Sequence, residues 1–136
     1  MWAVIDTSVY IGHWERGLYE DALADVRKAF VIRHSAVVLS ELRRGARTRE
    51  AERTINRLHV LARTVWELTP RDWWDAGQII RTVGDAHDWD RSKRRDFQND
   101  ALIALTARRH GATVVPANRD DFGLLRRALG ISILAV

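Results

Sequence analysis

Short apolar runs recur along the chain and have the length of buried β-strands. Such runs are typical of a parallel sheet covered on both faces, whose strands lack the alternation of inward and outward positions. We expect strands within Trp2–Ile5, Phe30–Ile32, Thr64–Leu68, Ala112–Val115 and Gly130–Val136.

Segments with a helical spacing of apolar residues lie between these runs. In the first of them Leu23, Val26 and Phe30 fall on one stripe, as in an amphipathic helix. We expect helices within Tyr19–Ala29, Ser35–Arg44, Glu50–Ala62, Asp72–Val83, Phe97–His110 and Asp120–Leu129. Because strands and helices alternate, the sequence predicts one α/β domain over residues 1–136, with helices on both faces of a parallel sheet.

Composition narrows the class of protein. A chain of 136 residues has the size of a single domain, and it contains no cysteine, which excludes a disulfide scaffold, a thiol nucleophile and a zinc ribbon. The longest stretches without a charged residue have nine residues, far short of a membrane span. We expect a cytoplasmic protein without a secretion signal or a membrane partner.

The basic residues are nearly all arginine. Of the 22 basic residues only Lys28 and Lys93 are lysines, and the formal net charge is +4. Guanidinium groups suit phosphate recognition, but codon usage in a GC-rich genome would also enrich arginine. Basicity alone therefore does not establish binding to nucleic acid.

Two acids follow predicted strands. Asp6 comes directly after Trp2–Ile5, and Asp121 lies a few residues beyond Ala112–Val115. Ligand sites of parallel α/β sheets form at the carboxyl ends of strands, where the connection order reverses. Each acid could also simply cap the helix that follows it.

Two further acids interrupt apolar helical segments. Glu41 and Asp100 would be partly buried, and a buried carboxylate needs a cation, a hydrogen-bond donor or water. Asp100 could instead be a helix-start acid that interacts with the helix dipole. Asp96 precedes it by one turn on the same face, so it either flanks a site or caps the helix.

The four acids would repel one another if they met in one cleft. A hard divalent cation relieves that repulsion, and Mg²⁺ or Mn²⁺ binds oxygen ligands. The five histidines show no metal-ligand spacing and there is no cysteine. These residue types therefore favour an ion bound by oxygen ligands over zinc.

Four motifs around these acids resemble the PIN-domain family. Their order and approximate spacing match, and the closest likeness within the family is to the short VapC-type toxins of bacterial and archaeal toxin–antitoxin pairs. The motifs are Asp6-Thr7-Ser8-Val9, Ser40-Glu41-Leu42-Arg43-Arg44-Gly45-Ala46, Asn99-Asp100-Ala101-Leu102-Ile103-Ala104 and Asn118-Arg119-Asp120-Asp121-Phe122.

The resemblance implies a metal-dependent endoribonuclease with a three-layer α/β/α fold and about five parallel strands. It also implies a quartet of acids that binds one or two Mg²⁺ or Mn²⁺ ions. Cleavage of RNA at such a site would leave a 5′-phosphate. Thr7 and Asn118 match supporting polar positions, whereas Pro116 stands where the family usually carries Thr or Ser. The catalytic and metal-binding acids would be Asp6, Glu41, Asp100 and Asp121.

The resemblance also implies partners. VapC-type relatives commonly form homodimers and are inhibited by an antitoxin whose tail fills a groove near the acids. Basic clusters flank Glu41 and Asp100, and we expect them either to contact the RNA substrate or to form a solvated surface. The candidate RNA contacts are Arg43, Arg44, Arg47, Arg94 and Arg95.

The tryptophans leave a second question open. Trp73 and Trp74 are adjacent, so they cannot both face the core from one helix, and at least one should meet a loop, a partner or a second protomer. An alternative function is a catalytically silent PIN-like module that binds nucleic acid or protein. Metal titration separates the two, since a binding module would show neither stabilisation by a divalent ion nor cleavage.

Overall fold

The computed structural model describes all 136 residues. Its strands are β1 (Trp2–Ile5), β2 (Val31–Ser35), β3 (Val65–Trp66), β4 (Thr113–Val115) and β5 (Ser132–Ile133). Its helices are α1 (Thr7–Arg16), α2 (Glu20–Ala29), α3 (Ala36–Gly45), α4 (Arg49–Leu61), α5 (Pro70–Ala86), α6 (Arg91–His110) and α7 (Arg119–Leu129).

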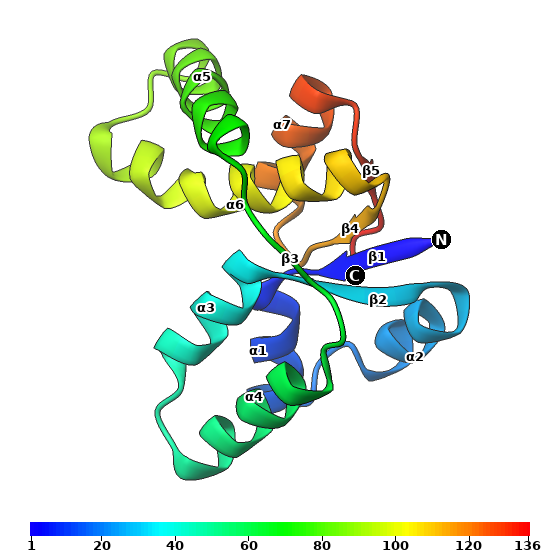
Figure 1. Cartoon of the computed structure of the whole chain (residues 1–136). Coiled ribbons are helices and arrows are strands. Elements are labelled where there is room, and N and C mark those ends of the chain that lie inside the picture. The colour runs from blue at the N-terminus through cyan, green and yellow to red at the C-terminus, as the bar shows by residue number, and fades with distance from the viewer.

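The sheet has five parallel strands in the order β3-β2-β1-β4-β5. Helices α1 to α4 lie on one face of it and α5 to α7 on the other (Figure 1). This confirms the predicted α/β/α layers. The order reverses at β1, which pairs with both β2 and β4, so the carboxyl end of β1 is the position where such folds form ligand sites.

The hydrophobic core is formed mainly by residues of the central strands and of α6. Ala3 and Val4 of β1 are fully buried, as are Phe97 and Leu102 of α6 and Phe122 of α7. Covering the sheet on both faces removes these side chains from water and supplies most of the stabilisation of the fold. No helix combines the length and apolarity needed to cross a membrane.

Several element ends differ from those predicted. Helix α6 begins at Arg91 rather than Phe97, because the Asp90 side chain accepts the Lys93 N–H at 2.8 Å and caps the helix. The suggestion that Asp96 caps this helix is therefore wrong. Helix α5 begins at Pro70 with a capping box between Thr69 and Asp72, which stabilises an additional first turn.

The outer strands are shorter than the apolar runs that contain them. Only Ser132–Ile133 pairs as β5, although the backbone of Leu134 still donates to the Val114 carbonyl at 2.9 Å. Strand β2 instead continues to Ser35 through the polar residues Arg33 and His34. The structure also contains α1, which hydrophobic spacing left unassigned and which begins at the cap residue Asp6.

Candidate active site

Asp6 lies at the switch point of the sheet and caps α1. Its backbone N–H donates to the Val115 carbonyl at 3.0 Å, which joins the ends of β1 and β4. One carboxylate oxygen accepts the backbone N–H and the hydroxyl of Ser8. The residue is only 5% exposed, and burial raises the pKa of the Asp6 carboxyl while the Ser8 hydrogen bonds lower it. Asp6 is both the helix cap and a buried acid.

Glu41 reaches the same place from α3. That helix begins directly after β2, where Ser35 caps it by accepting the Val37 N–H, so its residues start at the carboxyl edge of the sheet. The Thr7 hydroxyl donates to Oε1 of Glu41 at 2.9 Å. Thr7 thus fixes the orientation of Glu41, and it is the residue next to Asp6.

Asp100 lies among these acids on α6. Desolvation, followed by the charges of Asp6, Asp121 and Glu41, raises its pKa to about 8, although Lys93 opposes the shift. None of the side-chain hydrogen bonds of the protein ends on its carboxylate, which distinguishes it from the other three acids. The four predicted acids therefore lie close enough to interact, and burial together with repulsion by the other three disfavours the charged form of Asp100.

Asp121 completes the cluster from the first turn of α7. Asn118 caps that helix by accepting the Asp121 N–H at 3.2 Å, and its amide donates to Oδ2 of Asp121 at 3.0 Å. The contact forms without a hydroxyl at position 116, where Pro116 is buried. The ammonium of Lys93 donates to both oxygens of Asp121 at 2.9 Å.

Lys93 is the residue that sequence reasoning missed. It is not among the candidate site residues predicted from the sequence, yet it forms an ion pair with Asp121 inside the acidic cluster. The signal that could have found it is its chemistry, because it is one of two lysines in a chain that otherwise uses arginine. It also lies on the same helix as Asp100, two turns earlier.

The side chains of the acidic cluster have the type of ligand atoms that Mg²⁺ and Mn²⁺ bind. These atoms are carboxylate oxygens with amide and hydroxyl neighbours, the ligand chemistry that these hard ions prefer. As the side chains are oriented, no three of them stand ready to hold one ion, because Glu41 turns to Thr7 and Asp121 to Lys93. Burial, and after it the charges of the other three acids, raise the pKa of Asp100, and a divalent ion bound beside it would favour its charged form.

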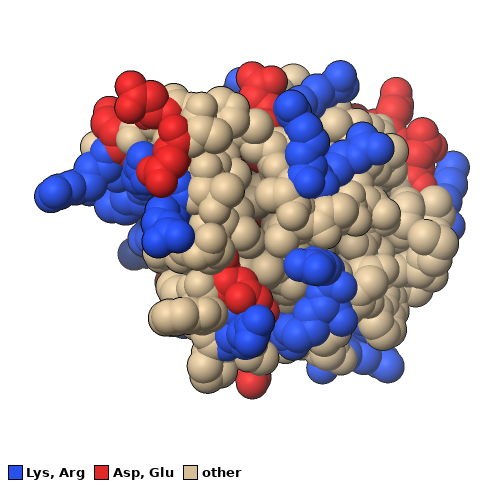
Figure 2. All heavy atoms as spheres, turned by 90° about the horizontal axis from the view of Figure 1, so that it is seen from above, with Lys and Arg blue, Asp and Glu red and all other residues tan.

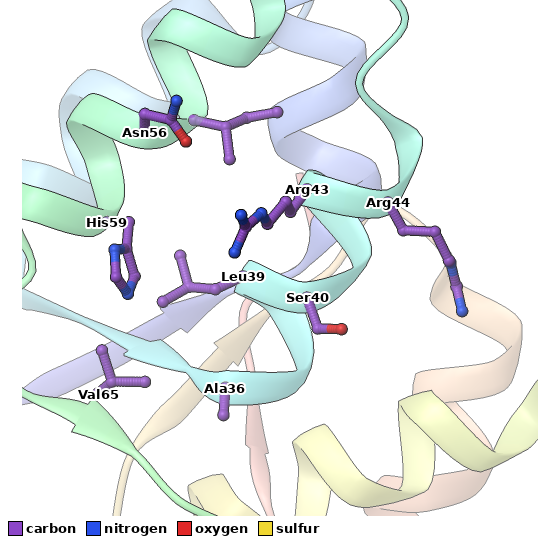
Figure 3. A pocket seen from close by; sticks show the side chains of 9 residues that line it. Ala36, Leu39, Ser40, Arg43, Arg44, Asn56, His59 and Val65 are labelled. Atoms are coloured by element: carbon purple, nitrogen blue, oxygen red, sulfur yellow. The ribbon is translucent and has the colours of Figure 1, made fainter.

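The predicted RNA-binding arginines separate into different environments. Arg43, Arg44, Arg47 and Arg95 are exposed, and Lys and Arg side chains protrude in several groups around the face shown in Figure 2. Arg43 points into the space between α3 and α4, whereas the side chain of Arg44 points away from that space (Figure 3). Asp96, with its side chain 72% exposed, lies within 3.8 Å of Arg95 and outside the acidic cluster.

Arg94 is an exception among these arginines. Its guanidinium donates to the Trp89 carbonyl at 3.0 Å and to Asp85 at 2.9 Å. It also packs so closely on Gly84 that a Cβ there would lie 2.8 Å from its Cζ atom. These contacts hold α5 and α6 together, so Arg94 has a structural role. The other four arginines remain candidate RNA contacts.

One cavity of the protein is separate from the acids. It has a volume of about 480 Å³, lies between α3, α4 and β3, and receives the side chains of Arg43 and His59 (Figure 3). None of the four acids lines it. A smaller cavity of about 210 Å³ adjoins the cluster and is lined by Glu41, Arg44 and Trp73, among others.

Neither member of the tryptophan pair on α5 enters the core. Trp73 is 50% exposed and Trp74 is 77% exposed. The prediction that the two cannot both face the core is confirmed, and both side chains lie at the surface. Large exposed aromatic side chains next to each other are typical of an interaction surface.

The sequence was compared with models of known families. A model described as the PIN domain matches residues 3–127, which is nearly the whole chain. This chain belongs to the PIN-domain family. The acids Asp6, Glu41, Asp100 and Asp121 all fall within the matched range. A search of curated proteins found no significant match.

Solved structures with the same fold come from toxin–antitoxin systems. The VapBC2 structure from Rickettsia felis, bound to a promoter DNA fragment, is 21% identical with a TM-score of 0.67 and covers 100% of this chain and 99% of that chain. VapBC-1 from nontypeable Haemophilus influenzae is 17% identical with a TM-score of 0.72, over 99% and 98% of the two chains. VapBC-5 from Mycobacterium tuberculosis is 23% identical with a TM-score of 0.61, over 99% and 98%. At these identities the likeness establishes the fold.

Proposed function

We propose that this PIN-domain protein is a cytoplasmic, Mg²⁺- or Mn²⁺-dependent endoribonuclease and the toxin of a toxin–antitoxin pair. The convergence of four carboxylates from separate segments, at the switch point of the sheet, carries the proposal. A protein gains no stability from placing like charges together in a half-buried cleft. Such clusters serve chemistry that needs a cation.

Asp6 and Asp100 are the principal candidates to hold the ion. Each keeps at least one carboxylate oxygen that no protein donor engages, since Ser8 contacts a single oxygen of Asp6. When bound, the ion supplies Lewis-acid chemistry that polarises a phosphodiester and activates water for its hydrolysis. Glu41, oriented by Thr7, completes the site or positions water beside it, and Asp121 acts as an outer group.

The exposed arginines would bind the RNA backbone. Arg44 lines the small cavity together with Glu41, which places it beside one of the acids. Arg43, Arg47 and Arg95 are also exposed, and we propose that they contact phosphates farther along the RNA. Positive side chains near the acids attract the phosphates of the RNA. The acids themselves repel these phosphates unless a bound cation neutralises them.

Removal of the metal or of Asp6 should abolish cleavage. Purified protein is expected to cleave single-stranded RNA with Mg²⁺ or Mn²⁺, to stop in EDTA, and to recover when the ion is restored. Asp6→Asn keeps the cap acceptor for Ser8 but removes the charge, so it should lose cleavage by about 100-fold or more, as expected for a direct ligand. Full, metal-independent cleavage by this variant would contradict the proposal. No cleavage by the wild type in any divalent ion would favour the silent binding module.

The antitoxin has a candidate docking cavity. Between α1 and the α3–α4 connection lies a cavity of about 300 Å³, lined by apolar side chains that include Ile11, Trp14 and Leu42. Trp14 is 36% exposed. An apolar segment of an antitoxin would cover these side chains, as in other helix-in-groove complexes.

A second copy of the chain is the candidate partner for α5. Trp73 and Trp74 would be removed from water in a symmetric dimer, and Trp73 would bring the second chain next to the cavity that contains Glu41.

Both partner proposals are tested by mass in solution. Light scattering should give the mass of two chains for the wild type, of one chain for Trp74→Glu, and of a larger complex when the product of an adjacent antitoxin-like reading frame is added. Introducing a charge at Trp74 prevents burial of the apolar surface. A wild type that is monomeric at every concentration, or a variant that stays dimeric, would contradict the dimer. A neighbouring protein that fails to bind would contradict the antitoxin.

A further inference from the structure

Lys93 places a positive charge inside the acidic cluster. Its ammonium lies 2.9 Å from both carboxylate oxygens of Asp121, on a side chain that is 38% exposed, while that of Asp121 is 14% exposed. The two residues are 28 positions apart in the chain. An ammonium is a compact point charge, so this contact neutralises the Asp121 carboxylate where it stands.

The position of Lys93 is supported by its surroundings. Its ammonium lies 4.9 Å from the centre of the Trp89 ring and 5.9 Å from that of Phe97, and the two rings pack edge to face at 4.8 Å. Cation–π attraction holds the charge at these rings. Trp89 is itself fixed, because Arg94 donates to its carbonyl. Lys93 is therefore held beside Asp121 by two packed aromatic rings.

The four acids differ in how many of their oxygens the protein already engages. Both oxygens of Asp121 accept from Lys93, and Oδ2 also accepts from Asn118. By contrast, Asp6 and Glu41 each offer an oxygen without a protein donor, and Asp100 offers two. The capacity to bind a divalent ion is thus concentrated on one side of the cluster.

We propose that Lys93 is a permanent cation of this site, which neutralises Asp121 and limits the cluster to one divalent ion on the side of Asp6 and Asp100. The inference rests on the proposed function, since it takes the cluster to be a metal site. Two-metal sites hold their ions about 4 Å apart by shared carboxylates. A second ion at Asp121 would need the oxygens that Lys93 occupies and would be repelled by its charge.

The number of bound ions tests this proposal. Calorimetric titration with Mn²⁺, checked by electron paramagnetic resonance of the free ion, should give one ion per chain for the wild type. Lys93→Met removes the charge and keeps an apolar chain against Trp89 and Phe97, and it should bind two. Lys28→Met is the matched control, because Lys28 is the other lysine and is exposed on α2, and it should bind one.

A second variant keeps the test decisive if Lys93→Met unfolds. Asp121→Asn should still bind one Mn²⁺ per chain, because Asp121 is not expected to be a direct ligand. Two ions bound by the wild type, a single ion bound by a folded Lys93→Met, or loss of the ion in Asp121→Asn would each overturn the inference. Two ions in a wild type that cleaves RNA would leave the proposed function standing, whereas a wild type that binds no ion and cleaves nothing overturns both.

Discussion

Asp100→Asn is expected to melt at a higher temperature than the wild type in metal-free buffer at pH 8, and to lose RNA cleavage by about 100-fold or more. The two effects have one cause. The Asp100 carboxylate is partly buried, lies near three other acids and accepts no side-chain hydrogen bond, so its charge destabilises the fold when no metal is present. The same charge would hold the ion. Thermal melts in EDTA and cleavage assays in Mn²⁺ measure the two halves of this prediction.

The sign of the pH dependence follows from the raised pKa of Asp100. Its ordinary value is 3.8, and the folded protein holds it at about 8. Between these values the folded state binds a proton that the unfolded state has released, so the stability of the metal-free protein falls as pH rises. The fall is up to about 1.4 kcal/mol per pH unit. Stability should therefore be higher at pH 5 than at pH 8, and Asp100→Asn should remove much of this slope.

Asp96→Asn is the control for that experiment. Asp96 is on the same helix, one turn earlier, and its side chain is 72% exposed. Its substitution should change neither the pH slope nor the response to Mn²⁺. Equal pH slopes for the wild type and Asp100→Asn would show that Asp100 is not the group under repulsion.

Phe97→Ala is expected to lower the free energy of unfolding by about 3–5 kcal/mol. Phe97 is fully buried and packs edge to face on Trp89 at 4.8 Å, so the substitution leaves a cavity under α6 that close packing cannot fill. The loss should be visible as a lower urea midpoint in metal-free buffer. It would also remove one of the two rings beside Lys93.

Leu61→Ala provides the comparison for Phe97→Ala. Leu61 ends α4 and is 70% exposed, so its truncation should change the free energy of unfolding by no more than about 0.5 kcal/mol. A similar, small effect for both variants would contradict the assignment of Phe97 to the core.

Two of the four candidate site acids were indicated by strand ends and two by the helical pattern. Asp6 directly follows a buried strand, and a charged residue such as Asp100 stands out within an apolar helix. These signals are local, because a strand end and an amphipathic stripe are each read within a few residues. They indicate which residues are candidates, and the parallel topology brings them together.

The contacts that refine the site could not be predicted in this way. The ion pair of Lys93 with Asp121 depends on α6 starting at Arg91 and on the angle between α6 and α7, neither of which hydrophobic spacing reports. Arg94 was predicted to contact RNA. Its ion pair with Asp85 joins α5 to α6, and such a contact cannot be recognised from the local sequence. Long-range pairings between polar side chains depend on the packing of helices, which leaves little trace in the local sequence.

Diffraction from a crystal grown with Mn²⁺ and recorded at the manganese edge tests the central claim most directly. We expect one anomalous peak per chain, within coordination distance of carboxylate oxygens of Asp6 and Asp100, with Glu41 beside it. Absence of any peak in the cleft at saturating Mn²⁺, with Asp6 and Asp100 directed to separate surroundings, would contradict the claim that these acids form a divalent metal site.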